Sequence, residues 1–177
     1  MLPELDVTDL PPDAVEVGRV GEAWGIKGWF KVLAHSSAPE AIFSSKRWYL
    51  APAERGTRGF EGHRLLRLVE VKEHAGGIVA QAQAIQDRTA AEKLRGARVF
   101  IARGSFPSTG PDEHYWVDLI GLQVIGAADP VHSASGAAWL AQQLGSRLVC
   151  IEGCGHYPMY ETPDDLDRAL SEFLDQN

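Results

Sequence analysis

The chain has 177 residues, of which 45% are apolar and 23% charged, with a net charge of −7. This composition is typical of a globular protein with one large or two small domains. No apolar run approaches the roughly 18 residues of a membrane span, and the acidic, proline-containing N-terminus resembles neither a secretory nor a transit peptide, so the sequence predicts a cytoplasmic protein.

The charge is distributed unevenly along the chain. Residues 17–72 contain ten Lys and Arg against five Asp and Glu, whereas residues 126–177 contain two against eight. A basic β-rich segment permits contact with RNA, although a mixed, solvated surface explains the same charge equally well.

A glycine-rich hairpin is the most informative part of the first half. Residues 1–14 predict a flexible leader, and apolar residues then alternate over 15–20 and again over 30–34, which indicates two strands. Gly21, Gly25 and Gly28 lie between these strands, and their spacing fits neither of the nucleotide phosphate-binding loops. Two lysines and two tryptophans are expected on or beside the turn: Lys27, Lys31, Trp24 and Trp29.

Further strands are predicted over residues 47–50, 64–72, 78–82 and 98–102, with one short helix over 87–94 that ends before Gly96. Together with the hairpin they predict a compact six-stranded β-barrel over residues 15–103. Residues 104–113 are rich in turn-forming residues and predict a linker.

Three ordered motifs carry a resemblance to a known family. They are GRVG at 18–21 followed by WGIKG at 24–28 and FKV at 30–32, then DRTAAEKLRG at 87–96, then YWVDLIGL at 115–122. Over about residues 15–124 the chain resembles the bacterial ribosome maturation factor RimM family. The resemblance implies a first barrel followed by the opening strand of a second, PRC-type barrel.

The same resemblance implies a function and a set of contact residues. It implies a non-catalytic factor in ribosome biogenesis and rRNA processing, which binds the head of the assembling small ribosomal subunit through a ribosomal protein and rRNA. The partner-binding candidates are Gly25, Lys27, Gly28, Lys31, Tyr115 and Trp116. Where the family has two adjacent tyrosines before the tryptophan, this chain has His114 and Tyr115. Alternatively, Tyr115 and Trp116 are ordinary strand residues with one face in a core.

Beyond Leu122 the pattern changes to β-α-β-α, with a strand that begins at Leu122 and ends in the acid Asp129, a second strand over 147–151, and helices over 134–144 and 163–174. This part resembles the C-terminal end of an α/β-hydrolase, which implies Asp129 as the triad acid and His156 as the base. The chain has no G-x-S-x-G nucleophile elbow, so we expect no catalysis and no cofactor. Asp129 is then expected to be a strand-end cap or an exposed acid, and His156 a turn residue.

The sequence therefore predicts an α+β chain in which the barrel domain is followed by a small β-α-β-α fragment, as in a chimera of two families. The fragment over 114–177 is expected to pack through apolar residues of its helices and to depend on the barrel or on self-association; these residues are Trp139, Leu140, Leu144, Leu170, Phe173 and Leu174. Two alternatives to the ribosomal function remain, namely an inactive hydrolase fragment and a chimera that has lost ribosome binding.

The only cysteines, Cys150 and Cys154, predict neither a disulfide framework nor a zinc finger. Together with His132 and His156 they can supply four metal ligands. Free thiols in a reducing compartment are much commoner, so no metal is predicted.

Overall fold

The computed structural model describes residues 5–36, 39–54, 59–110 and 113–176. The chain divides into two units, Met1–Ser108 and Thr109–Asn177. The linker was predicted to begin at residue 104. Phe106, however, still packs against the core of the first unit. None of the described helices is long and apolar enough to cross a membrane.

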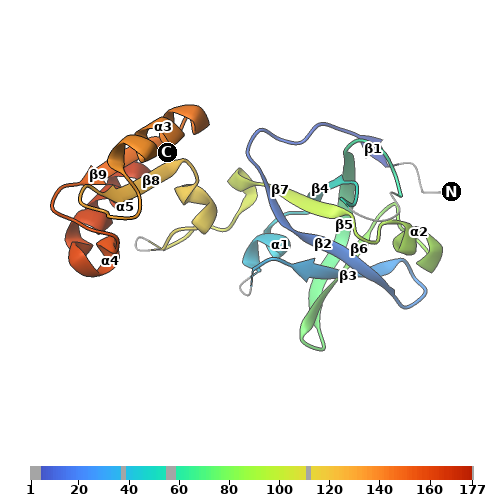
Figure 1. Ribbon diagram of the computed structural model, residues 1–177. Helices are drawn as coiled ribbons and strands as arrows, with labels where there is room; N and C mark the ends of the chain where they lie inside the picture. The colour runs from blue at the N-terminus through green and yellow to red at the C-terminus, as the bar shows by residue number, and fades with distance from the viewer. Residues whose placement is uncertain (1–4, 37–38, 55–58, 111–112, 177) are drawn as a thin grey trace. The chain divides into compact units, whose positions relative to one another are not determined.

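Seven strands form one antiparallel sheet in the first unit (Figure 1). The strands are β1 (Asp6–Val7), β2 (Ala14–Trp24), β3 (Trp29–Ala34), β4 (Arg47–Ala51), β5 (Arg64–His74), β6 (Gly77–Ala82) and β7 (Arg98–Ala102). Their order is β1-β5-β4-β7-β2-β3-β6, and β6 also pairs with β5, so the ladders lead from β5 through five other strands and back to β5. The predicted strand-rich first domain of an α+β chain is confirmed.

The core of this unit consists of the inward-facing side chains of these strands and of α2 (Arg88–Lys93). The largest side chains exposed by less than 2% include Trp48, Phe30, Ile42, Leu50, Leu66, Ile85, Leu94 and Ile101. Helix α2 begins where the Asp87 carboxylate accepts the N–H of Ala90 at 2.8 Å, and it buries Ala90 and Ala91. The short helices α1 (Glu40–Ser44) and η1 (Arg103–Ser105) complete the unit.

The segment expected to be a flexible leader is part of this fold where the structure describes it. Strand β1 pairs with Arg64 and Leu65 of β5, and Leu5 is only 8% exposed in the core. The Asp13 carbonyl and carboxylate accept the N–H groups of Arg103 and Gly104. The proline and acid content suggested a leader, but backbone pairing does not depend on those side chains.

The second unit contains η2 (Trp116–Leu119), β8 (Leu122–Gly126), α3 (Ala134–Leu144), β9 (Arg147–Ile151), α4 (Pro158–Glu161) and α5 (Pro163–Leu174). Strands β8 and β9 are parallel and pair from Leu122 with Arg147 to Gly126 with Ile151. The expected opening strand at Tyr115–Leu119 is wrong. A 3-10 helix replaces it, closed by the Asp118 N–H donating to the Tyr115 carbonyl.

Three of the residues expected in the core of this unit lie on its surface. Trp139, Leu140 and Leu144 of α3 are 63%, 43% and 65% exposed. The buried side chains are instead Ile125, Ala141, Ile151, Cys154, Ala169 and Phe173. A sheet of two strands covers only the alanine-bearing face of α3, so the opposite apolar face has no packing partner within the described part of this unit.

The two glycines of the β2–β3 turn differ in what surrounds them, which gives a test of this fold. Both have positive φ, +73° at Gly25 and +76° at Gly28. A Cβ at Gly25 would enter open space, whereas one at Gly28 would collide with the carbonyl of Ile85. We predict that Gly25→Ala lowers the free energy of unfolding by about 1 kcal/mol, from the positive φ alone. Gly28→Ala should lower it by about 3 kcal/mol, because backbone must also move.

The measurement is equilibrium urea unfolding of the full chain, followed through the backbone amide signals of β2 and β3 so that only the first unit is reported. An equal loss in the two variants would contradict the packing of Gly28 against Ile85.

Candidate functional site

The predicted contact residues of the hairpin lie at one turn and one strand. Gly25 and Lys27 are exposed in the turn between β2 and β3, while Gly28 is buried beneath it. The side-chain amide of Gln81 on β6 donates to the Lys27 carbonyl at 3.2 Å, which ties the turn to the sheet. The turn therefore presents the Lys27 side chain from a fixed backbone.

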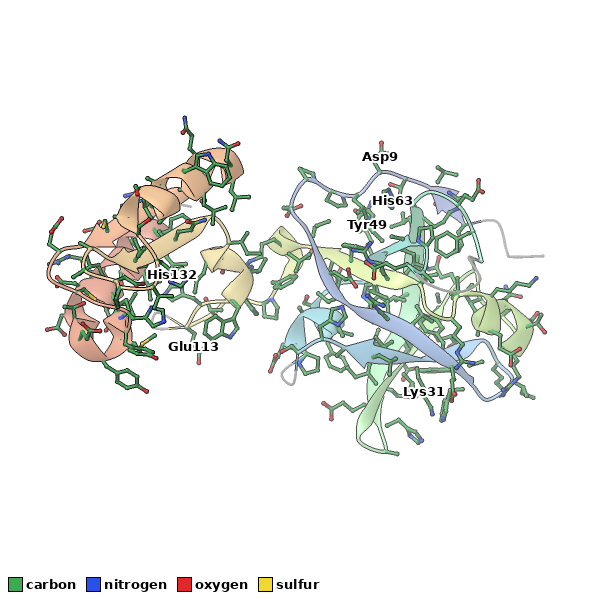
Figure 2. All side chains as sticks on the ribbon, in the orientation of Figure 1. Asp9, Lys31, Tyr49, His63, Glu113 and His132 are labelled. Atoms are coloured by element: carbon green, nitrogen blue, oxygen red, sulfur yellow. The ribbon has the colours of Figure 1, made fainter. Side chains whose placement is uncertain are left out.

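Lys31, labelled in Figure 2, belongs to a row of residues that crosses three strands. Val79 of β6 pairs with Lys31 of β3 on one side and with Lys72 of β5 on the other. Residues directly opposite each other in antiparallel strands share a face, so the two lysines flank Val79. Val79 is only 2% exposed, and the aliphatic stems of lysines can cover such a side chain while keeping the ammonium groups in water.

Aromatic rings adjoin this row. The Trp24 and Trp29 rings meet edge to face at 5.7 Å, and the Trp24 and His74 rings lie 4.7 Å apart. The Lys72 ammonium lies over Trp29, 4.3 Å from the ring centroid, in cation–π geometry. We call Trp24, Trp29, Lys31, Lys72 and His74 the tryptophan–lysine surface. A groove of about 400 Å³, lined by Trp24, Lys31, Leu33 and His74 among others, runs along it.

Acidic neighbours partly neutralise the lysines of this surface. Glu22 lies 3.7 Å from the Lys31 ammonium, and Glu70 lies 2.8 Å from that of Lys72. All four side chains are about half exposed, at which level such pairs stabilise little and exchange readily. The lysines thus remain available to a partner that carries stronger negative charge.

Tyr115 and Trp116 lie in the second unit, at the start of η2. The Trp116 side chain is 88% exposed, whereas Tyr115 is partly buried. The alternative in which one face of a strand buries these residues does not hold for Trp116. An indole so exposed is available to a partner.

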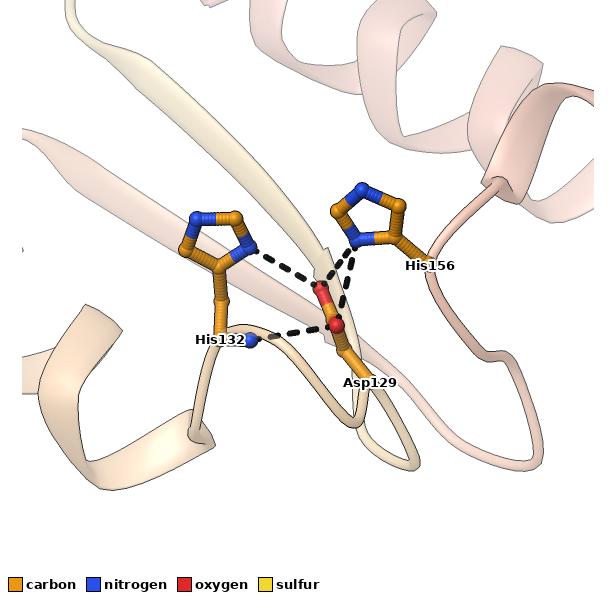
Figure 3. A group of neighbouring side chains, drawn as sticks. All are labelled: Asp129, His132 and His156. Carbon is orange, nitrogen blue, oxygen red and sulfur yellow. Dashed lines mark hydrogen bonds and ion pairs between the residues drawn. The ribbon is translucent and has the colours of Figure 1, made fainter.

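Asp129 and His156 meet in the second unit, as the sequence suggested (Figure 3). His156 Nδ1 lies 3.1 Å from each carboxylate oxygen of Asp129. Asp129 Oδ1 also accepts the N–H groups of Val131 and His132, at 2.7 and 3.1 Å. Asp129 therefore caps the turn after β8, but its side chain is 5% exposed and not an exposed acid.

The pKa of Asp129 is strongly lowered. Burial alone would raise this pKa. Hydrogen bonds from the Val131 N–H, from His156 and from the His132 N–H outweigh burial, and the Coulombic interaction with His156 lowers the pKa further. The carboxylate is thus kept ionised.

Among the described residues, no nucleophile is hydrogen-bonded to this pair. Ser133 lines the same cavity as His156, but its Oγ accepts the Gly136 N–H at 3.1 Å and caps α3. No hydrogen bond joins His156 to a serine hydroxyl within the described residues. An acyl-enzyme mechanism requires an attacking group beside the acid and the base.

Two features of these sites were not foreseen in the sequence. One is the contact of His132 with Asp129: the sequence had named His132 only beside the cysteines, whereas its Nδ1 lies 3.4 Å from Asp129 Oδ2 and its ring stacks on that of His156 at 5.5 Å. The other is the participation of Lys72 and His74 in the surface around Trp24. The four-ligand set with two cysteines does not form, because the cluster of possible metal ligands in the described residues contains Asp129, His132 and His156 but no cysteine.

The RimM N-terminal domain model matches residues 15–106. The chain is 61% identical over 125 residues to ribosome maturation factor RimM of Albidiferax ferrireducens, which is 71% of this chain and 67% of the relative. It is also 61% identical over 125 residues to the same factor of Paracidovorax citrulli, at 70% and 65% coverage. The chain thus spans about two thirds of the length of these curated relatives.

Two solved structures are similar to part of the chain. The putative 16S ribosomal RNA processing protein RimM of Pseudomonas aeruginosa has 27% identity, a TM-score of 0.45, and coverage of 64% of this chain and 62% of that one. The N-terminal domain of RimM from Thermus thermophilus has 24% identity, a TM-score of 0.42, and coverage of 54% and 95%. None of these matches supports the expected α/β-hydrolase resemblance or the interpretation of the chain as a chimera, so both stay predictions.

The lowered pKa of Asp129 predicts a dependence of stability on pH. A carboxyl group whose pKa is lower in the folded state stabilises the fold fully above its unfolded pKa, about 3.9 for Asp, and loses this contribution as the pH falls through the folded value. Asp129→Asn should therefore unfold more easily than the wild type at pH 6, and the difference should shrink progressively below about pH 4. Urea unfolding at a series of pH values, followed through amide signals of β8 and β9, measures this. A difference that stayed constant down to acid pH would contradict it.

Proposed function

The chain belongs to the RimM family, and from this we propose that it is a non-catalytic ribosome maturation factor that binds the assembling small ribosomal subunit. The observation that carries the proposal is the family match over residues 15–106, supported by 61% identity to relatives named ribosome maturation factor RimM. The head region of the subunit, through a ribosomal protein and nearby rRNA, is the proposed place of contact.

The tryptophan–lysine surface is the proposed contact region of the first unit, together with Lys27 on the adjoining turn. RNA is bound by ammonium groups that meet phosphates and by aromatic rings on which unpaired bases stack. Lys31 and Trp24 place one group of each kind in the lining of the groove, and the surface adds Lys72 over the Trp29 ring. Gly25 and Gly28 contribute by shaping the turn, because their positive φ values place Lys27 at its tip.

Tyr115 and Trp116 are the proposed contact residues of the second unit. The 88% exposure of Trp116 supports this role, since exposed tryptophan is a frequent anchor in protein interfaces. These two residues suit a ribosomal protein better than RNA, because the acidic residues of this half of the chain disfavour a phosphate backbone.

Charge reversal tests the surface. We predict that the double variant Lys31→Glu, Lys72→Glu weakens binding to small ribosomal subunits at least tenfold at low salt, because two attractive contacts become repulsive. The matched control is Lys46→Glu, Lys93→Glu, which changes the net charge equally but lies outside the surface. Co-sedimentation of the full chain with purified immature small subunits, repeated at rising salt, gives the apparent affinities.

An equal loss in the control would show that net charge alone matters and would remove the assignment to this surface. Absence of wild-type co-sedimentation at low salt would overturn the proposed function. It would favour the alternative of a chimera that has lost ribosome binding.

Self-association through α3 is proposed for the second unit. The exposed Trp139 and Leu144, with Leu140 beside them, support it, because an apolar helix face is stabilised when a second copy covers it. We predict that the wild type sediments as a concentration-dependent dimer and that Trp139→Gln, Leu144→Gln sediments as a monomer. The control Tyr160→Gln changes a side chain that is 83% exposed and outside α3, and should leave the dimer intact. A wild type that stays monomeric over a 100-fold range of protein concentration would contradict self-association.

A further inference from the structure

The cluster of Asp129, His132 and His156 has one feature that hydrogen bonding does not explain. His156 Nδ1 is within hydrogen-bond distance of the Asp129 carboxylate, at 3.1 Å. His132 Nδ1 faces the same carboxylate at 3.4 Å, which is longer than a normal hydrogen bond to a charged group. The His132 side chain is 64% exposed, so water could solvate it elsewhere, yet its ring lies parallel to that of His156.

The Asp129 carboxylate is oriented as a metal ligand would be. Its Oδ1 accepts two backbone N–H groups, from Val131 and His132, which fix the carboxylate plane. Its Oδ2 receives no backbone N–H among the described residues and faces the two imidazoles (Figure 3). Ligating carboxylates are characteristically held in this way by hydrogen bonds to the rest of the group.

Two distances within the cluster are close to those between the ligand atoms of a small divalent ion. Nitrogen and oxygen ligands lie about 2.0–2.2 Å from Zn²⁺, which places neighbouring ligand atoms of a tetrahedral site roughly 3.3–3.6 Å apart. Asp129 Oδ2 lies 3.1 Å from Nδ1 of His156 and 3.4 Å from that of His132. One ligand atom from each of the three residues lies within 4.8 Å of the others, and binding of one ion requires the exposed His132 ring to turn until the three atoms reach tetrahedral spacing.

We propose that Asp129, His132 and His156 bind one divalent transition-metal ion of the Zn²⁺ class. Two imidazoles and one carboxylate are a ligand set that suits Zn²⁺ and disfavours Mg²⁺ and Ca²⁺, which prefer oxygen ligands. Three protein ligands leave a coordination position free, and a cavity of about 590 Å³ adjoins all three residues. That position is available to water or to a small anion that enters the cavity. The site lies in the second unit and is independent of the proposed ribosomal function.

The test uses the full chain without a histidine tag, freed of metal with a chelator and then dialysed. Calorimetric titration with Zn²⁺ should give one site per chain, and Co²⁺ should give the visible absorption of a tetrahedral nitrogen and oxygen site. Mg²⁺ should give no binding signal. His132→Ala should weaken Zn²⁺ binding at least tenfold, because it removes one ligand of three. The His132 side chain is exposed, so we expect the variant to fold, and circular dichroism checks this.

The matched control is His114→Ala, which removes an exposed histidine of the same unit outside the cluster. Wild-type affinity in this control together with loss in His132→Ala and in Asp129→Asn supports the proposal. Absence of Zn²⁺ binding by the wild type overturns it. Unchanged affinity in His132→Ala, or transfer of the loss to Cys150→Ser, overturns it as well, because the ion would then lie elsewhere.

Discussion

Strand β2 must accept a neighbour along both of its edges while it bends, and the first unit depends on this constraint. Gly18 pairs with Ala34 of β3 on one side and with Val99 of β7 on the other. A Cβ at Gly18 would collide with the Leu33 carbonyl, so only glycine permits this approach. Register shifts interrupt both ladders of β2, and such bulges increase the local bend and twist of a strand. The ladders can then continue around the core to β5.

The position of the tryptophan–lysine surface follows from this arrangement. Because β3 pairs with β6 and β6 pairs with β5, the β2–β3 and β5–β6 hairpins lie side by side. Because the two hairpins are adjacent, Lys72 contacts the Trp29 ring and His74 contacts the Trp24 ring. The groove is thus a consequence of which strands are adjacent, and its basic and aromatic groups come from two hairpins that are distant in sequence.

The sequence predicted the strands of the first unit because their apolar residues alternate and glycines mark their ends. It also drew attention to Lys31 and Trp24, which stand in one hairpin. It could not reveal Lys72 and His74 as their neighbours, since cross-strand contacts depend on register, which alternation alone leaves open. Strand β1 was missed for another reason. Two residues are too few to show a period, and the pairing of β1 with β5 uses backbone groups. The apolar residues of α3 were assigned to a core because periodicity identifies an apolar face but not whether another element covers it.

The second unit shows how parallel pairing can gather a site from a short stretch of chain. Strands β8 and β9 run in the same direction, so the loops that follow them leave from one edge of the sheet. Asp129 comes after β8 and His156 after β9, which explains how residues 27 positions apart meet. His132 joins the pair because Asp129 Oδ1 accepts the His132 N–H at 3.1 Å, and this places the His132 ring beside the other carboxylate oxygen, Oδ2. The spacing D-x-x-H after a buried strand was visible in the sequence. The sequence did not show that the capped turn leaves one carboxylate oxygen of Asp129 facing two imidazoles, because this arrangement depends on the folded backbone.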